Sequence, residues 1–442
     1  MLRQVGGKSE NRIDEVCMAD ASYPVPFKSG LEFNAPVHGT WNIVHIGMQL
    51  PEAIQIYVCA QNCMRGVVLT AAEMNAADRF SFVILSEKDM VSGDVEEATI
   101  RGVIDVIEKR KDMPKAVLLF TVCAHHFLGC DYNRIYRELE AHFPEIVFHR
   151  CYMDPIMQKK GLTPDQKLRR AILEKLPQRE AKENVVSLLG SDFLLDEECE
   201  LVSLLQDNDM NLRQLKTCRT YDEFKNLSEG SAFVCIYPPA KVGAELVAKR
   251  LERPFYYLPA NFSYELIETQ MNQLADGLHL PEQDYSVQRH ACDVVLEKAK
   301  EVIGDTSIAI DYTVHPRTLG LAKLLIMHGF CVERIYIDGI NREEEAEFHW
   351  LKEHAPDLIL SATIHVNKRV CARGCGEKVL AIGQKAAWFE DTPWFVNMVS
   401  GAGLYGYSGI QRMAELMVEA YRTPKDTKDI VPRKGWGCES CL

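Results

Sequence analysis

A chain of 442 residues is too long for one compact hydrophobic core, so we expect two or three domains. The formal net charge of −13 argues against nucleic acid and anionic membranes as partners, because both select basic surfaces. No apolar run is long enough to cross a bilayer and residues 1–16 lack the apolar core of a secretion signal, so we expect a cytoplasmic protein.

The chain contains 15 cysteines, an odd number. Thiols stay reduced in the cytoplasm, so a disulfide framework is not expected. Metal ligation, redox chemistry and burial as small hydrophobic side chains remain open.

Strands and helices alternate from residue 41 onward, whereas residues 1–35 show little periodicity and are expected to wrap the first domain. Apolar runs predict strands at residues 53–58, 80–85, 115–122 and 145–153. Helical spacing of apolar residues predicts helices at residues 95–110 and 167–176. This alternation is typical of parallel sheets with helical crossovers.

The same alternation occurs twice more after the charged segment 176–184. It predicts further strands at residues 183–190, 232–237, 255–260, 307–312, 331–339 and 357–363. It predicts further helices at residues 197–208, 221–230, 240–251, 289–304, 316–329, 342–355 and 407–422. We therefore predict an α/β fold of three Rossmann-like, doubly wound parallel-sheet domains, at residues 1–180, 181–288 and 289–442.

Two strand-to-helix turns carry pairs of cysteines: Cys59 and Cys63 follow the first predicted strand, and Cys123 and Cys130 follow the strand at 115–122. Ligands of parallel sheets gather at the carboxyl ends of the strands, where helix N-termini stabilise negative charge. Iron–sulfur clusters take thiolate ligands from separate loops. The sequence therefore predicts such a cluster here, although the spacing does not match a ferredoxin and buried structural cysteines remain the alternative.

Other cysteines and histidines allow more than one interpretation. Cys235 ends a predicted strand and is either structural or functional. His125 and His126, beside Cys123, could bind a ligand, relay protons or cap the turn. Two close pairs could bind metal, form reversible disulfides or have no role: Cys371 with Cys375, and Cys438 with Cys441.

Familiar catalytic motifs are missing from the sequence. There is no phosphate loop of the form G-x-x-x-x-G-K-[ST], so nothing indicates that this chain binds ATP. The absence of G-x-S-x-G and H-E-x-x-H weakens a hydrolase interpretation.

Residues 377–422 resemble the closing portion of nitrogenase component 1 chains and their relatives, which include dark-operative tetrapyrrole reductases and cofactor-assembly scaffolds. The resemblance covers nearly the whole chain, with Cys63 in IQIYVCAQNCMRG and Cys123 in TVCAHHFLGCD on family cluster cysteines. It implies an iron–sulfur cluster of 4Fe-4S type or larger at a subunit interface, with Cys63 and Cys123 among its ligands. We predict that Cys59, Cys63 and Cys123 hold this cluster, with Cys130 in reserve. The resemblance also implies an ATP-hydrolysing iron protein as electron donor, and a homo- or hetero-oligomer with a component 1-type chain.

The chain departs from the family in two places. His38 stands in the segment where the family has its first cluster cysteine, and Cys59 is the candidate substitute. Cys235 lies close to the cysteine that anchors the nitrogenase cofactor, but the histidine that completes this anchor has no equivalent in residues 394–403.

These departures make dinitrogen a doubtful substrate. We therefore predict a nitrogenase-like reductase subunit with an unidentified substrate, in which Cys235 and His126 are candidate binders of a second metallocofactor or a tetrapyrrole-like ligand. The alternatives are a non-catalytic scaffold for metallocofactor assembly, and a redox or metal sensor that uses the Cys438/Cys441 tail.

Overall fold

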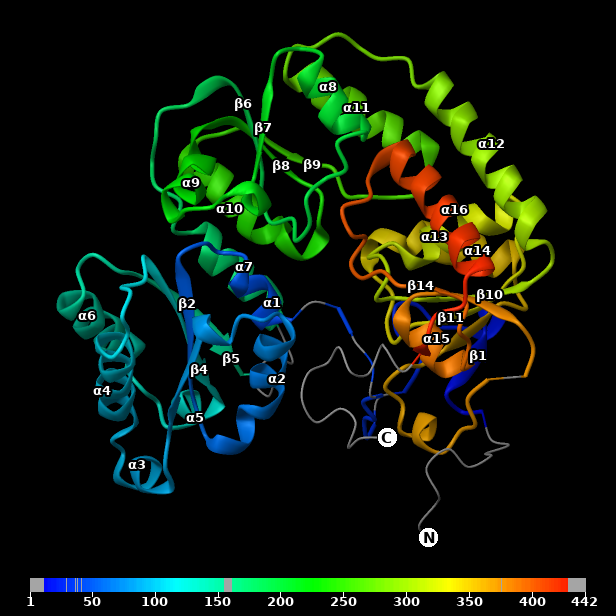
Figure 1. Cartoon of the computed structure of the whole chain (residues 1–442). Coiled ribbons are helices and arrows are strands. Elements are labelled where there is room, and N and C mark those ends of the chain that lie inside the picture. The colour runs from blue at the N-terminus through cyan, green and yellow to red at the C-terminus, as the bar shows by residue number, and fades with distance from the viewer. Residues whose placement is uncertain are drawn as a thin grey trace. The chain divides into compact units, whose positions relative to one another are not determined.

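The computed structural model describes residues 12–427 except residues 29, 36, 38, 41, 155–160 and 375 (Figure 1). The described residues form two compact units. Trp41–Leu194 and Asp209–Pro259 form the first, which we call the two-sheet unit. Met1–Thr40, Leu195–Asn208 and Ala260–Leu442 form the second, the one-sheet unit.

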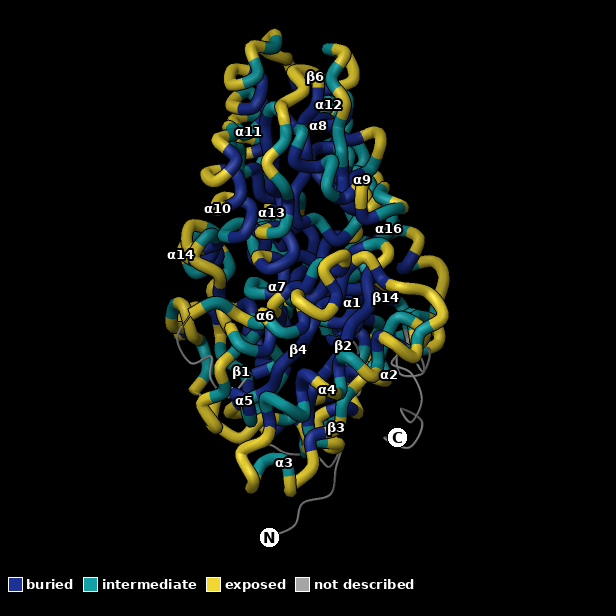
Figure 2. Tube along the Cα trace, turned by 90° about the vertical axis from the view of Figure 1, so that its left-hand side faces the viewer, coloured by how far each residue is buried: buried dark blue, intermediate teal, exposed yellow. Residues whose placement is uncertain are grey.

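The N-terminal sheet of the two-sheet unit has four parallel strands in the order β3-β2-β4-β5. Its strands are β2 (Ala53–Cys59), β3 (Phe80–Ile84), β4 (Ala116–Val122) and β5 (Val147–Met153). The two central strands, β2 and β4, are buried along their whole length, as their unbroken apolar runs predict (Figure 2). The chain leaves these neighbouring strands toward opposite edges of the sheet, so the carboxyl ends of β2 and β4 form its topological switch point.

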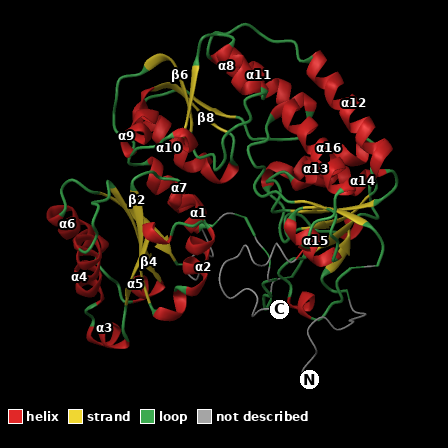
Figure 3. Ribbon diagram, in the orientation of Figure 1, coloured by secondary structure: helices red, strands yellow, loops and turns green. Residues whose placement is uncertain are grey.

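Helices cover both faces of this sheet (Figure 3). On one face lie α1 (Ile43–Met48), α2 (Arg65–Glu73) and α7 (Pro164–Leu173), and on the other α4 (Val95–Glu108) and α6 (Tyr132–His142). The short helices α3 (Glu87–Ser92) and α5 (Cys123–Phe127) complete this part of the chain. Strand alternation divides the core: Tyr57 stacks on Phe120 at 4.3 Å on the α2 side, whereas Ile56 packs on the α4 side.

The middle sheet is also parallel, in the order β7-β6-β8-β9. Its elements are β6 (Lys182–Leu188), β7 (Asn211–Gln214), α9 (Tyr221–Lys225), β8 (Gly230–Cys235), α10 (Lys241–Leu251) and β9 (Phe255–Tyr257). It shares one hydrophobic core with the N-terminal sheet, to which Cys59, Cys151 and Cys235 all belong. A Cβ added to Gly243 of α10 would collide with the backbone of Arg170 in α7. The lack of a side chain at Gly243 therefore allows these two helices to pack closely.

The one-sheet unit is built on six strands in the order β1-β12-β11-β10-β13-β14. The strands are β1 (Glu15–Cys17), β10 (Ser307–Asp311), β11 (Val332–Tyr336), β12 (Ile359–Ser361), β13 (Val379–Ile382) and β14 (Phe395–Val396). The helices are α8 (Glu200–Gln206), α11 (Tyr264–Gly277), α12 (Ser286–Ile303), α13 (Thr318–Met327), α14 (Glu345–His354), α15 (Gln384–Glu390) and α16 (Gly406–Arg422). Strands β10 to β14 are parallel, and their switch point lies between β10 and β13.

Short 3₁₀ helices join these elements in both units. They are η1 (Met18–Asp20), η2 (Gln61–Cys63), η3 (Ala77–Arg79), η5 (Leu215–Thr217), η6 (Asn226–Glu229), η7 (Pro238–Ala240), η8 (Arg342–Glu344) and η9 (Val366–Arg369).

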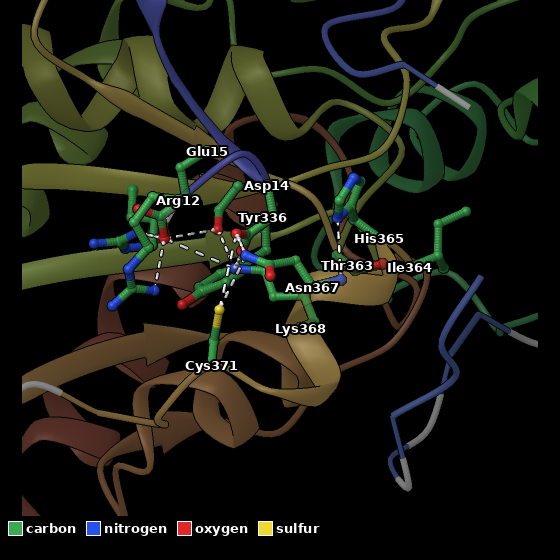
Figure 4. Close-up of polar contacts among 12 residues, drawn as sticks. Arg12, Asp14, Glu15, Tyr336, Thr363, Ile364, His365, Asn367, Lys368 and Cys371 are labelled. Atoms are coloured by element: carbon green, nitrogen blue, oxygen red, sulfur yellow. Dashed lines mark hydrogen bonds and ion pairs between the residues drawn. The ribbon is translucent and has the colours of Figure 1, made fainter. Parts of the chain in front are cut away.

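The prediction that the N-terminal segment wraps the first domain was wrong for its described residues. Strand β1 pairs antiparallel with β12, with Glu15 opposite Ser361, and so extends the C-terminal sheet. The buried carboxylate of Asp14 anchors it, 2.8 Å from the ammonium of Lys368 and 2.6 Å from the amide nitrogen of Asn367 (Figure 4). The strand pairing and the ion pair thus attach this segment to residues far along the chain, although the N-terminal sheet is nearer in the sequence.

The predicted fold class, three doubly wound α/β sheets, is confirmed. The domain boundaries at 180/181 and 288/289 remain a proposal. Within the part of the chain that the structure describes, no helix is long and apolar enough to span a membrane.

Candidate functional site: the cysteine turns of the N-terminal sheet

The two predicted cysteine turns lie at the switch point of the N-terminal sheet. Strands β2 and β4 are hydrogen-bonded neighbours with Tyr57 opposite Phe120, so both turns leave the same edge. The chain after β2 enters α2 on one face, and the chain after β4 leads to α6 on the other. Cys63 and Cys123 therefore lie at the edge where ligands of such sheets bind.

The two cysteines after β2 have different surroundings. Cys59 is the last residue of β2, and its side chain is fully buried in the hydrophobic core. Burial, and then the neighbouring Cys63 thiol, raise the pKa of Cys59 to about 12, so its thiol stays protonated at neutral pH. Cys63 ends η2 and is exposed. Of these two thiols, only that of Cys63 is open to a ligand in this conformation.

The two cysteines after β4 are both partly exposed. Cys123 is the first residue of α5, and Cys130 follows Gly129, which has the left-handed φ of 65° that a glycine tolerates. The backbone N–H of Cys130 donates to the carbonyl of His125 at 3.0 Å. Burial, and then Glu96, raise the pKa of Cys130. Cys123 is therefore the better-placed thiol of this turn.

A single chain does not assemble a complete metal site from these side chains. Among the described residues, no group of three or more His, Cys, Asp or Glu side chains is arranged to hold a metal ion. None of the cysteines that the structure describes forms a disulfide with another described residue. On these two neighbouring turns the described residues present three accessible thiols, those of Cys63, Cys123 and Cys130.

The adjacent histidines differ in burial. His126 is exposed on α5, so its predicted role as a cofactor ligand remains a proposal. His125 is fully buried, and its Nδ1 accepts the N–H of Val122 at 3.3 Å while its Nε2 lies 3.0 Å from the hydroxyl of Thr99. Burial lowers the pKa of His125 to about 4, so the ring is neutral. Nothing in the sequence distinguishes these two neighbouring histidines.

Apolar side chains are exposed along the same edge. Ile84, which ends β3 and lies opposite Cys59, is 49% exposed, and Phe82 on the same strand is 44% exposed. Phe127 at the end of α5 is 64% exposed. Ile84 and Phe82 thus lie on the strand next to β2, and Phe127 lies on the short helix that follows β4.

Cys235 lies at the equivalent edge of the middle sheet, as the last residue of β8, but its side chain is fully buried in the shared core. Its cofactor-binding role remains a proposal. Cys371 is buried beside Asn367 and Asp14 (Figure 4). The remaining predicted candidates lie outside the described residues: His38, Cys375, Cys438 and Cys441.

The switch point of the C-terminal sheet holds a buried charge cluster that the sequence analysis missed. Asp311 ends β10 and accepts the N–H of Ala386 at 2.7 Å and that of Thr313 at 2.8 Å. Lys385, at the start of α15, is also buried, and burial lowers its pKa despite the nearby Asp311 and Asp338 carboxylates. Two features of the sequence could have indicated this cluster: the acidic Asp311 at the end of one strand, and the residues Gly-Gln-Lys directly after another strand.

The chain is a doubly wound α/β protein with accessible thiols at a switch point, the place where proteins of this class bind their ligands. The family model "Nitrogenase component 1 type Oxidoreductase" matches residues 44–422. Because the match spans most of the sequence, the chain belongs to this family, and the predicted resemblance is confirmed.

Two solved structures show the same fold. The chain in "Nitrogenase Cp1 at pH 6.5" is 13% identical with a TM-score of 0.67, and the alignment covers 89% of this chain and 94% of that one. The chain in "Nitrogenase Cp1 at pH 5" is 11% identical with a TM-score of 0.55, with coverages of 93% and 94%. No match was found among curated protein sequences.

Proposed function

We propose that this chain is the reductase subunit of a nitrogenase-like enzyme, with an iron–sulfur cluster at the switch point of its N-terminal sheet. It accepts electrons from an ATP-hydrolysing iron protein and delivers them to a substrate other than dinitrogen. The observation that carries the proposal is the position of Cys63 and Cys123, accessible thiols at the carboxyl ends of neighbouring parallel strands. One-electron transfer is the chemistry that an iron–sulfur cluster supplies when bound.

The donor set fits a cluster shared between two chains. Four thiolates commonly hold a 4Fe-4S cluster, and among the accessible thiols of these turns we rank two, Cys63 and Cys123, first. A second copy, or a homologous component 1-type chain, related by a two-fold axis would supply an equivalent pair. The exposed Phe82, Ile84 and Phe127 would be covered by this second chain and would keep water from the cluster.

Cys59 and Cys130 are the other two proposed ligands. Cys130 is partly exposed, but burial and the nearby Glu96 raise its pKa and so favour the protonated thiol over the thiolate. Cys59 would have to turn out of the hydrophobic core and lose its proton. We therefore rank Cys63 and Cys123 above both.

Family membership supports the electron source. Proteins of this family bind iron–sulfur clusters, form oligomers and work with an iron protein. No phosphate loop occurs in this sequence, which fits an enzyme whose partner hydrolyses ATP.

The test is iron and acid-labile sulfide analysis of the protein purified anaerobically from iron-replete cells, with its oligomeric state measured in parallel. Cys63→Ser and Cys123→Ser should each lose most of the iron, and the wild-type cluster should be found only in the oligomer. Cys331→Ser is the matched control, since Cys331 is a partly exposed thiol in the one-sheet unit and should keep full iron content. An iron-free wild-type protein, or full iron in the Cys63→Ser/Cys123→Ser variant, would refute the proposal.

One observation favours a second candidate function, a scaffold for metallocofactor assembly. The Cys235 thiol is buried in the core, so the family's cofactor anchor is not presented in this conformation. A scaffold releases its cluster to an acceptor protein, whereas a reductase consumes electrons in the presence of the iron protein and ATP. Incubating the iron-loaded protein with an apo-ferredoxin distinguishes the two, because only a scaffold should transfer iron without ATP.

A further inference from the structure

His125 is a fully buried polar side chain beside a proposed cluster ligand. It is the third residue of α5, and its Nδ1 accepts the N–H of Val122, the residue before the helix, at 3.3 Å. In a capping box, the side chain of the third helical residue, usually Glu, accepts a hydrogen bond from the backbone N–H of the residue before the helix. The ring of His125 makes the same hydrogen bond here. The imidazole therefore closes the N-terminal end of the turn that carries Cys123.

The second ring nitrogen ties this turn to another helix. Because Nδ1 accepts a hydrogen bond, the proton of the neutral ring lies on Nε2, which donates to the Thr99 hydroxyl at 3.0 Å. The Thr99 hydroxyl in turn donates to the carbonyl of Val95 at 2.7 Å. Both His125 and Thr99 are fully buried, so each of these polar atoms has a protein partner in place of water.

The backbone of the same residue holds the other cysteine of the turn. The carbonyl of His125 accepts the N–H of Cys130 at 3.0 Å. The ring of His125 also stacks against Tyr132 of α6, with 6.4 Å between centroids. One residue thus holds the backbone on both sides of α5, at Val122 and at Cys130.

We propose that His125 is a positioning residue: through Val122 and Thr99 it fixes α5 so that the Cys123 thiol lies at the carboxyl edge of the sheet. Its importance for the cluster rests on the proposed function, but its effect on the Cys123 thiol does not. A buried network in which every polar group is hydrogen-bonded specifies one conformation, whereas an apolar contact tolerates several. The contacts of His125 form such a network.

The experiment measures the rate at which Cys123 reacts with iodoacetamide in the metal-free protein, relative to Cys63 in the same sample, by peptide mass spectrometry. His125→Leu keeps the bulk but removes both hydrogen bonds. His125→Gln keeps an acceptor and a donor and should rescue the wild-type rate. Thr99→Val removes only the outer bond, and His126→Leu is the matched control on the exposed neighbour.

We expect the Cys123/Cys63 rate ratio to rise roughly fivefold in His125→Leu, the change that loss of one buried hydrogen bond's net contribution produces. Thr99→Val should raise it less, and His125→Gln and His126→Leu should leave it unchanged. A wild-type ratio in Thr99→Val and in folded His125→Leu would overturn the proposal, and if His125→Leu does not fold, Thr99→Val decides.

Iron content of the same variants separates this inference from the proposed function. If wild-type protein binds iron, His125→Leu should hold less than half as much. If wild-type protein binds none, the proposed function fails while the thiol ratio still decides the role of His125.

Discussion

Cys59 and Cys63 lie four residues apart at the end of β2, yet one thiol is fully buried in the hydrophobic core and the other is exposed. The difference follows from strand geometry. Cys59 is the last residue of β2, which is buried along its whole length, and it lies on the same face of the sheet as Tyr57, whereas Cys63 lies beyond the strand, in η2. The two cysteines should therefore behave differently toward any thiol reagent.

We predict that iodoacetamide at pH 8 labels Cys63 within minutes in the native, metal-free protein and labels Cys59 only on unfolding. The thiolate is the reactive form, and a thiol with a pKa of about 12 is almost entirely protonated at this pH. Pulse labelling followed by peptide mass spectrometry measures both sites at once. Equal labelling of the two would show that the turn opens and that Cys59 is available as a ligand.

The alternation of strands and helices was predictable because β2 and β4 are unbroken apolar runs ending in turns. Other elements carried too little local signal. Strand β14 has two residues and β13 four, below the length at which an apolar run is distinctive. Helix α11 buries only Ile267, Met271, Leu274 and Ala275, and the sequence analysis missed it. Strand β1 pairs with residues more than 340 positions away, which no local pattern reveals.

The site was partly predictable for a related reason. The rule that ligands lie at strand ends brings Cys63 and Cys123 to one edge without any structure. The unbroken apolar run of β2 also indicated the burial of Cys59, but the sequence analysis ended this strand at residue 58 and left Cys59 on the turn. The contacts of His125 with Thr99 could not be predicted, because they depend on how α4 packs against the sheet.

Breaking the ion pair that anchors β1 should destabilise the one-sheet unit. Lys368 is buried 2.8 Å from Asp14, and although burial opposes it, this ammonium holds the pKa of Asp14 below its ordinary value. Asp14→Asn leaves the buried ammonium with only the carboxylate of Glu15, 3.7 Å away, as counter-charge, and breaking a buried ion pair costs up to about 3–5 kcal/mol of unfolding free energy. Urea denaturation measures the loss.

The paired variant Asp14→Leu/Lys368→Met is the control for this prediction. It removes both charges and should recover most of the stability, because well-packed apolar residues commonly replace a buried ion pair without loss. If Asp14→Asn and the paired variant are equally stable, the ion pair does not anchor the strand.

Gly383 should not tolerate a side chain. Its φ is 113°, and a Cβ there would lie 2.3 Å from Oδ2 of the buried Asp311. Gly383→Ala should cost at least about 1–2 kcal/mol for the backbone conformation alone. Gly320→Ala is the matched control, since Gly320 lies in α13 and a Cβ added there would lie 3.6 Å from its nearest neighbour, so this variant should be neutral or stabilising. A Gly383→Ala protein as stable as Gly320→Ala in urea would contradict the close packing of β13 against Asp311.

Acidification should destabilise the two-sheet unit through His149, which lies in β5 and is fully buried. Its Nδ1 donates to the carbonyl of Ala171 at 3.0 Å, and its Nε2 accepts from the hydroxyl of Tyr221 at 3.3 Å. Burial lowers the pKa of His149 to about 4, whereas a histidine in the unfolded chain titrates near about 6.5. Between these two values the unfolded chain binds a proton that the native chain does not, so the free energy of unfolding falls as the pH falls from about 6.5 toward 4.

At pH 5 this difference amounts to about 2 kcal/mol. His149→Gln keeps a donor and an acceptor but cannot be protonated, so its urea midpoint should change less between pH 7.5 and pH 5 than that of the wild type. His142→Gln, at an exposed position in α6, should retain the wild-type pH dependence. If the urea midpoint of His149→Gln depends on pH as strongly as that of the wild type, His149 does not cause the acid sensitivity and other groups do.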